Sequence, residues 1–309
     1  MDQPGGVMPP TQGRPGRRRP RANLGRRRAV AAGLLLGFLA LALWLGMNAL
    51  GGGDGDEPAA TTTAAAPKPT ILRVVFPEGF TRKEMVTRVA EVRQIAITKR
   101  KVTPKLSGDA YAKASKAAKV PPAFRKDARG IEGFLFPATY EFTPKTTGEE
   151  LVNDQLEFFD ANWAKVDLAF AKTKNLTPYD VLIIASMIEK ETIAADERPL
   201  VAAVIYNRLK ARMELGIDAT IRYGLGVPGT EALRVSQLES DNPYNTRNRV
   251  GLPPTPIANP GLASMQAAAH PAKVKYLFFV RKPDKVHHFF TASEAEFYAK
   301  ACEYGYGCG

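Results

Sequence analysis

The sequence predicts an α+β protein that is anchored to a membrane by an N-terminal transmembrane helix, and three features of the 309 residues lead to this prediction. Residues 29–50 form an uncharged apolar run of 22 residues, and a helix needs about 20 such residues to cross a bilayer. Short strand patterns and longer helix patterns follow from Ile71 to the C-terminus. An apolar helix in the middle of the chain ends in two acids, Glu189 and Glu191.

The N-terminal segment sets the expected topology. Residues 1–28 form a basic tail with eight arginines and one acid, Asp2. Positive residues beside an apolar span stay in the cytoplasm, so we expect a single-pass protein with a cytoplasmic N-terminus and the following residues outside. There are two alternatives to the membrane span. A secretory signal peptide has an apolar region of only about 7–15 residues, and a buried soluble helix is seldom this long without a polar face. Residues 51–70, rich in Gly, Ala, Thr and Pro, predict a flexible linker.

The charge balance narrows the class of partner. The tail carries +7 of the formal net charge of +12, which leaves +5 for residues 29–309. A mildly basic exported domain suits an anionic envelope polymer or a membrane surface. We therefore expect no nucleic-acid partner, and we expect residues 29–50 to contact the lipid bilayer.

The cysteines and histidines show no metal-binding pattern. Cys302 and Cys308 lie close together at the C-terminus, and in an oxidising compartment such a pair predicts a disulfide. Two unstructured tail thiols are the alternative, and the spacing does not match a CxxC site. His270, His287 and His288 show no HExxH-type spacing, so we expect no metal and no cofactor.

The exported residues divide into two predicted parts. Residues 71–125 predict a small α+β module, with a strand at 71–76, a helix from Thr81 to about Ala96 and a lysine-rich helical segment at 98–122. Residues 126–309 predict a larger mixed domain. Its expected elements are, in order, an aromatic strand within 130–144, a helix at 149–171, a buried helix that opens at Thr177-Pro178, a helix at 196–215, an irregular stretch at 216–262, a hairpin of 274–280 with 286–290, and a helix from Ser293.

The buried helix carries the candidate chemistry. Each helical residue turns by about 100°, so Glu189 and Glu191 point about 200° apart. Glu191 continues the ridge of Ile184, Met187 and Ile188, whereas Glu189 faces away, where we expect a basic neighbour. Burial penalises a carboxylate and raises its pKa, which allows a carboxylic acid to donate a proton near neutral pH. Helix geometry alone indicates one structural and one functional glutamate.

Six motifs, one of them the end of this buried helix, make the sequence recognisable. They are Ile131–Tyr140, Ala185–Thr192, Tyr206–Leu209, Tyr244–Thr246, Gly251–Gly261 and Ala268–Ala272. In this order and at these distances they resemble the endolytic murein transglycosylases of the MltG (YceG-like) family, over about residues 71–300. The combination is specific, because six motifs in register seldom occur by chance.

The resemblance implies a fold, a location and an activity. It implies a catalytic domain with a lysozyme/transglycosylase-like active-site cleft, outside the bacterial inner (cytoplasmic) membrane. The implied substrate is the glycan strand of peptidoglycan. The implied reaction is cleavage of MurNAc–GlcNAc β-1,4 bonds within the strand, which leaves 1,6-anhydro-MurNAc ends. A peptidoglycan synthase is a suggested protein partner.

The resemblance also assigns roles to residues. It makes Glu191, the second acid of the Glu-x-Glu pair, the catalytic acid and then base. No protein nucleophile is needed, because the 6-hydroxyl group of the substrate attacks the anomeric carbon. The candidate substrate-binding residues are Glu132, Tyr140, Asn207, Tyr244, Asn245 and Asn259. Asn207 is expected to orient Glu191 and the others to contact the sugar; turn-forming or core roles are the alternatives.

Two other functions are the alternatives to a transglycosylase, and the sequence departs from the family pattern at one place. A non-catalytic peptidoglycan-binding or scaffold protein would keep the cleft without activity. A hydrolytic muramidase would need a second carboxylate in the cleft, for which Glu132 and Asp218 are the candidates. Many relatives carry a LysM-type sugar-binding stretch before the position of Ile71, whereas only the linker fills it here. The module at 71–125 is therefore a candidate for an abbreviated LysM-like region.

Overall fold

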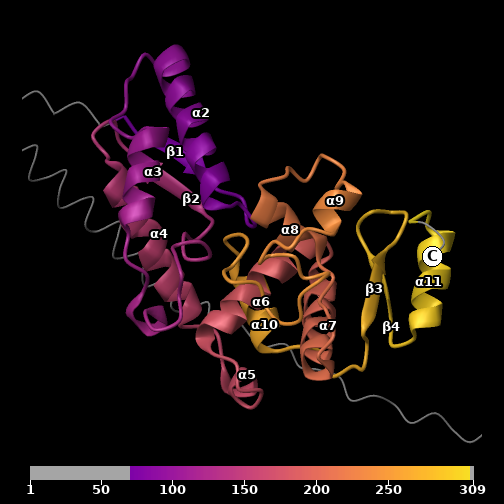
Figure 1. The fold of residues 1–309 in the computed structure, drawn as a ribbon. Helices are drawn as coiled ribbons and strands as arrows, with labels where there is room; N and C mark the ends of the chain where they lie inside the picture. Colours follow the sequence, from indigo (N-terminus) through magenta and orange to yellow (C-terminus); the bar gives the residue numbers. More distant parts are fainter. Residues whose placement is uncertain (1–69, 307–309) are drawn as a thin grey trace, which may run out of the picture. The chain divides into compact units, whose positions relative to one another are not determined.

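The structure is a computed structural model that describes residues 70–306, all of which belong to the compact unit Pro67–Gly309 (Figure 1). The predicted basic tail, the span at 29–50 and linker residues 51–69 lie outside the described residues, as do residues 307–309. Over residues 70–306, none of the helices combines the length and the apolar content that a membrane crossing requires. The transmembrane helix therefore remains a prediction.

The first strand pairs with a strand far along the chain. Strand β1 (Leu72–Val75) runs antiparallel to β2 (Thr139–Phe142). One face of the pair is buried, and on the other face the guanidinium of Arg73 lies 2.6 Å from the Glu141 carboxylate. The predicted strand at 71–76 is confirmed. Because the pairing joins residues on both sides of the boundary predicted between residues 125 and 126, the two predicted parts share a sheet.

Helices α2 (Arg82–Arg100) and α3 (Gly108–Ala117) follow β1, and together with α4 (Gly148–Trp163) they lie beside the strand pair (Figure 1). A capping box of Thr81 and Glu84 opens α2, which confirms the predicted start. The lysine-rich segment 98–122 is helical over only part of its length. Lys101 ends α2 in the left-handed conformation, and Pro104 disfavours a helical residue before it.

The predicted aromatic strand at 130–144 is wrong for its first half. After the short 3₁₀ helix η1 (Pro122–Phe124), the chain turns at Gly133, whose φ is +94°. Phe134 packs into the core, with its ring centroid 4.9 Å from that of Phe124. The alternating aromatic pattern therefore reflects core packing around a turn, and only β2 forms a strand.

The helix predicted at 149–171 is two helices. Helix α4 (Gly148–Trp163) begins at a capping box of Thr147 and Glu150, and α5 (Ala169–Lys172) follows a break. At the break, the Asp167 carboxylate accepts a hydrogen bond of 2.8 Å from the backbone N–H of Ala169. Such local side-chain bonds compete with helix continuation.

Helix α6 (Pro178–Glu191) is at the centre of the second part of the chain. A capping box of Thr177 and Asp180 opens it, and residues 181–188 are all buried. Helices α7 (Arg198–Ala211) and α10 (Leu262–Ala269) pack against α6, with the 3₁₀ helix η2 (Ala195–Glu197) before α7. The prediction of a helix that is buried on all sides is confirmed.

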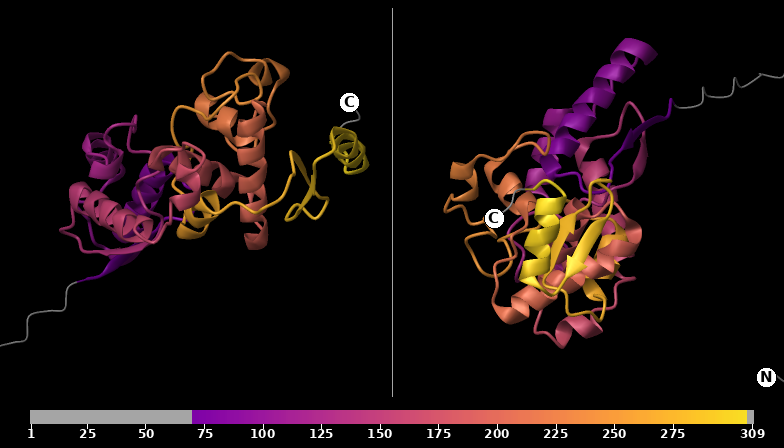
Figure 2. Two further views of the ribbon diagram at one scale, coloured as in Figure 1. Left: turned by 90° about the horizontal axis from the view of Figure 1, so that it is seen from below. Right: turned by 90° about the vertical axis from the view of Figure 1, so that its right-hand side faces the viewer.

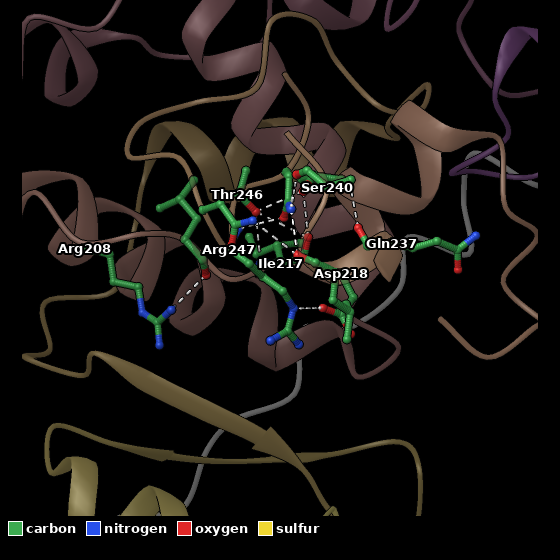
Figure 3. A network of polar contacts seen from close by, with 12 residues as sticks. Arg208, Ile217, Asp218, Gln237, Ser240, Thr246 and Arg247 are labelled. Atoms are coloured by element: carbon green, nitrogen blue, oxygen red, sulfur yellow. Dashed lines mark hydrogen bonds and ion pairs between the residues drawn. The ribbon is translucent and has the colours of Figure 1, made fainter. Parts of the chain in front are cut away.

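The stretch predicted as irregular at 216–262 contains two short helices, α8 (Asp218–Leu225) and α9 (Val235–Leu238). A network of polar contacts holds it (Figure 3). In this network the Thr246 hydroxyl accepts from the N–H of Ile217 at 3.1 Å, and the Arg247 guanidinium lies 2.6 Å from the Asp218 carboxylate. The rest of the stretch is irregular, as predicted.

The C-terminal elements match the prediction. Strands β3 (Phe278–Arg281) and β4 (His288–Thr291) form an antiparallel hairpin. Helix α11 (Glu294–Glu303) starts at its N-cap Ser293 and lies against the hairpin (Figure 2). The fold is α+β over the described residues.

Candidate active site

A cleft of about 1190 Å³ opens beside the C-terminal end of α6. Its walls come from the start of α2, the turn at 129–132, the end of α6, helix α8 with the residues after it, residues within 244–257, and strand β3. Among the residues that line it are three acids, two tyrosines and one arginine that the argument below uses: Glu132, Glu191, Asp218, Tyr223, Tyr244 and Arg281. The volume is large enough for more than one sugar ring.

Glu191 is the last residue of α6, and its partly buried side chain lines the cleft. Burial raises the pKa of this carboxyl group to about 7, the positive charge of Arg281 opposes that shift, and the negative charge of Asp218 adds to it. An acid with a pKa near the working pH can both donate and accept a proton. Glu191 therefore has the proton affinity that acid–base chemistry needs.

Glu189, in contrast, makes contacts with other parts of the fold. Its carboxylate accepts a 2.9 Å hydrogen bond from the N–H of Gly261 and lies 3.9 Å from the guanidinium of Arg198. The prediction that Glu189 meets a basic neighbour is confirmed, and Glu189 does not line the cleft. The two acids therefore lie in different environments, as expected from helix geometry.

Glu132 is a second acid in the cleft, and three donors hold it. Its Oε1 accepts from the N–H of Arg82 at 2.9 Å and from the amide of Asn259 at 2.7 Å, and its Oε2 accepts from the Tyr223 hydroxyl at 3.1 Å. Burial nevertheless raises the pKa of Glu132 to about 7, against the effect of these hydrogen bonds. The donors come from three segments far apart in sequence, so they fix the carboxyl group firmly.

Two tyrosines form an aromatic wall of the cleft. The rings of Tyr223 and Tyr244 have centroids 5.2 Å apart, and the Tyr244 hydroxyl lies 2.8 Å from the Thr255 hydroxyl. Burial raises the pKa of Tyr223, so its hydroxyl stays protonated and can donate to Glu132. Aromatic faces with polar tips are suited to sugar rings, which have apolar faces and hydroxyl edges.

The cleft lining does not include the other predicted substrate-binding residues, which are Tyr140, Asn207, Asn245 and Asn259. The Tyr140 ring is buried in the core, and its hydroxyl donates to the carbonyl of Phe136 at 2.8 Å. The Asn245 amide donates to the carbonyls of Leu238 and Ser240, both at 2.8 Å. These contacts correspond to the core and turn-forming roles that were the alternatives for both residues.

The side chains of Asn207 and Asn259 form hydrogen bonds with backbone groups. The Asn207 amide donates to the carbonyls of Val274 at 3.0 Å and Tyr276 at 2.8 Å, so its hydrogen bonds do not orient Glu191 as predicted. Asn259 is fully buried, and its Oδ1 accepts from the N–H groups of Gly133 and Leu135, both at 2.9 Å. Through its amide nitrogen it positions Glu132 rather than substrate.

Sequence reasoning missed Arg281 and Tyr223 as cleft residues. Arg281 is the last residue of β3, and Tyr223 lies on α8, which the sequence predicted as irregular. Neither belongs to one of the six motifs. Strand alternation would have predicted only that Arg281 faces outward. No local pattern in the sequence therefore indicated that Arg281 lines the cleft.

The other titratable groups of the described residues do not form a metal site. Over residues 70–306, no group of three or more His, Cys, Asp and Glu side chains is arranged to hold a metal ion. The buried His288 ring nitrogen Nδ1 lies 2.6 Å from the Glu197 carboxylate. Cys302 lies in α11, but Cys308 is outside the described residues, so their disulfide remains a prediction.

Comparison with known proteins decides the family. The model of the YceG-like family matches residues 56–303. The chain belongs to the YceG-like family. It is 30% identical over 259 residues to an endolytic murein transglycosylase of Bacillus subtilis, and the match covers 82% of this chain and 68% of that relative. The sequence-based identification of the family is confirmed.

Two further proteins are similar to this chain, and one of them has a solved structure. An endolytic murein transglycosylase of Streptococcus pneumoniae is 30% identical over 242 residues, which are 74% of this chain but only 42% of that relative. A solved structure of a YceG-like protein from Listeria monocytogenes aligns with a TM-score of 0.62 at 29% identity, over 75% of each chain. The fold described above is therefore similar to that of this YceG-like protein.

Proposed function

We propose that this protein is a peptidoglycan lytic transglycosylase that cuts MurNAc–GlcNAc β-1,4 bonds within glycan strands and leaves 1,6-anhydro-MurNAc ends. The observation that carries the proposal is Glu191, a cleft acid whose pKa is raised to about 7 by burial. It lies in a chain of the YceG-like family, two of whose members matched above are named endolytic murein transglycosylases.

Glu191 acts first as an acid and then as a base. In its protonated form it donates the proton to the glycosidic oxygen as the bond from that oxygen to the anomeric carbon breaks. The 6-hydroxyl oxygen of the same MurNAc then bonds to the anomeric carbon, and its proton passes to the Glu191 carboxylate. No water is consumed and Glu191 is regenerated, so a single carboxyl group is sufficient. A pKa near 7 makes both forms accessible at neutral pH.

Glu132 and Tyr244 are the proposed substrate contacts. The three donors to Glu132 use both lone-pair sites of Oε1 and one site of Oε2, so Oε2 can accept one further hydrogen bond from a sugar hydroxyl or N-acetyl N–H. Tyr244 contributes an aromatic face and a hydroxyl at the wall of the cleft. Asn259 contributes indirectly, because it holds Glu132.

The proposed location follows from the N-terminal sequence. The apolar run at 29–50 and the arginines of residues 1–28 support a single-pass inner-membrane protein with a cytoplasmic N-terminus. The cleft would then lie outside the cytoplasm, where peptidoglycan is found. A peptidoglycan synthase is a proposed partner, since cleavage within new strands must be coordinated with their synthesis.

Paired substitutions on one helix test the proposal. Purified sacculi are digested with the wild type, with Glu191→Gln and with the matched control Glu189→Gln, and mass spectrometry identifies the new chain ends. We expect 1,6-anhydro ends from the wild type and from Glu189→Gln, whose amide can still accept from Gly261. Glu191→Gln should release none, because an amide cannot donate the proton. Anhydro ends from Glu191→Gln would contradict the assignment.

The same experiment separates the two alternatives. New reducing ends would identify a muramidase that uses water, with Glu132 or Asp218 as its second carboxylate, since both line the cleft. Absence of any cleavage by the wild type would favour the non-catalytic scaffold. The proposal requires anhydro ends as the main product.

A further inference from the structure

Arg281 makes a direct contact with the backbone of Glu191. Its guanidinium Nη2 donates a 2.8 Å hydrogen bond to the Glu191 carbonyl oxygen, across 90 residues of sequence. The last four carbonyls of a helix have no partner inside the helix, and cations are favoured at this end. Arg281 therefore caps α6 at the residue that carries the acid, and it also lines the cleft.

The strand that carries Arg281 is held in place independently. Arg281 is paired with His288 across the β3–β4 hairpin. The Nδ1 atom of His288 lies 2.6 Å from the buried Glu197 carboxylate, which also accepts the His288 backbone N–H at 2.8 Å. Glu197 immediately precedes α7, which packs against α6. These contacts link the β3–β4 hairpin to helices α6 and α7, and they fix the backbone position from which the Arg281 side chain extends.

The charges around Glu191 oppose one another. Arg281 and Lys190 favour its carboxylate form, whereas burial and Asp218, from α8, favour its neutral form. Glu189 and Arg198 pair with each other away from the cleft. The other charged residues that line the cleft are Arg82, Lys83, Glu84, Arg129, Glu132 and Arg222. Asp218 is itself held by Arg247, at 2.6 Å.

We propose that Arg281 is a positioning residue, which anchors the backbone of Glu191 and places a positive charge beside its carboxyl group in opposition to Asp218. This inference rests on the proposed function, in which Glu191 must serve as an acid and then as a base. Burial alone would make Glu191 a good acid and a poor source of carboxylate. Arg281 offsets part of that effect and keeps both forms accessible, while Asp218 limits the offset.

A pH–rate series on the full-length protein tests the inference. Release of anhydro ends is measured from pH 5 to 9 for the wild type, Arg281→Met, Arg281→Lys and Asp218→Asn. Activity falls at high pH, where Glu191 loses its proton, and this fall is the alkaline limb of the pH–rate profile. Removal of the Arg281 charge should raise the pKa of Glu191 and so move the alkaline limb to higher pH by about one unit. Asp218→Asn should move it downward, and Arg281→Lys, which keeps the charge, should leave it near the wild-type position.

Arg73→Met is the matched control. Arg73 pairs with Glu141 on the exposed face of β1, away from the cleft, so its removal should not move the limb. Glu132 also has a pKa of about 7, but its charged neighbour is Arg82, so neither Arg281→Met nor Asp218→Asn removes a charge beside it. A shift in these variants therefore reports on Glu191.

The outcomes separate this inference from the proposed function. Opposite shifts in Arg281→Met and Asp218→Asn support the inference. Unchanged limbs, or shifts in the same direction, overturn it even if the wild type releases anhydro ends. If circular dichroism shows that Arg281→Met is unfolded, the shifts of Asp218→Asn and Arg281→Lys decide. A wild type that releases no anhydro ends at any pH contradicts the proposed function itself.

Discussion

Replacement of Asn259 by alanine should lower both the stability of the protein and its activity. The buried Asn259 side chain is the only described hydrogen-bond acceptor for the N–H groups of Gly133 and Leu135. Its amide also donates to Glu132 at 2.7 Å. The alanine variant removes all three contacts, and no other side chain among the described residues makes them.

The expected magnitude follows from the two N–H groups left without a partner. A buried donor without a partner costs about 1–3 kcal/mol, so two such groups cost about 2–6 kcal/mol. The carbonyl of Phe80 loses the Asn259 amide as a donor, but it still accepts the Asn259 backbone N–H. The loss is large relative to a typical total stability of about 5–15 kcal/mol. Activity should fall as well, because Glu132 loses one of its three donors.

Urea unfolding of Asn259→Ala beside Asn245→Ala measures this loss. Asn245 is a matched control, since it is also fully buried and its amide also bonds to backbone groups. Its removal affects the carbonyls of Leu238 and Ser240, which tolerate a lost bond better than an N–H group does. It also affects the backbone N–H of Arg247, but Arg247 is exposed, so water can replace that bond. We expect the larger loss for Asn259→Ala. A loss below about 1 kcal/mol, or a larger loss for Asn245→Ala, would refute the reasoning from unpaired donors.

Three further predictions concern stability. Burial raises the Glu191 pKa from 4.5 to about 7, so the folded state binds more protons between these values and stability falls as pH rises through them. Glu191→Gln should therefore gain about 3 kcal/mol at pH 8 and nothing at pH 4 in urea unfolding. Thr177→Ala removes the N-cap of α6 and should cost about 1 kcal/mol in thermal unfolding, with an unchanged pH–rate profile. Gly148→Ala would place a Cβ atom 2.6 Å from the Ala110 carbonyl oxygen and should cost about 1–3 kcal/mol. The control Gly130→Ala, whose Cβ would meet nothing within 4 Å, should change the unfolding midpoint little.

Helix starts were predictable because their chemistry is local. The capping boxes of Thr81 with Glu84 and of Thr177 with Asp180 involve residues three positions apart. The N-cap Ser293 likewise accepts from a nearby N–H, that of Glu296. Such bonds depend on a few neighbouring residues and form wherever the chain enters a helix.

The segment at 130–144 shows where local pattern fails. Its alternating aromatic residues predicted a strand, but the N–H groups of Gly133 and Leu135 bond to Asn259, more than 120 residues away. Once a side chain satisfies the backbone, no strand partner is needed. Phe134 of this segment then packs against Phe124 and Phe159.

The sequence by itself determined the family and the separation of Glu189 from Glu191, because motif order and the angle per residue of a helix are properties of the chain alone. Only the tertiary structure decided that Tyr223 and Arg281 share a cleft with Glu191 and Glu132. It also decided that Tyr140, Asn207 and Asn245 support the fold instead. The physical reason is that the contact of Arg281 with Glu191 spans 90 residues and that of Asn259 with Glu132 spans 127. These contacts depend on how helices and hairpin pack, which no local pattern of residues encodes.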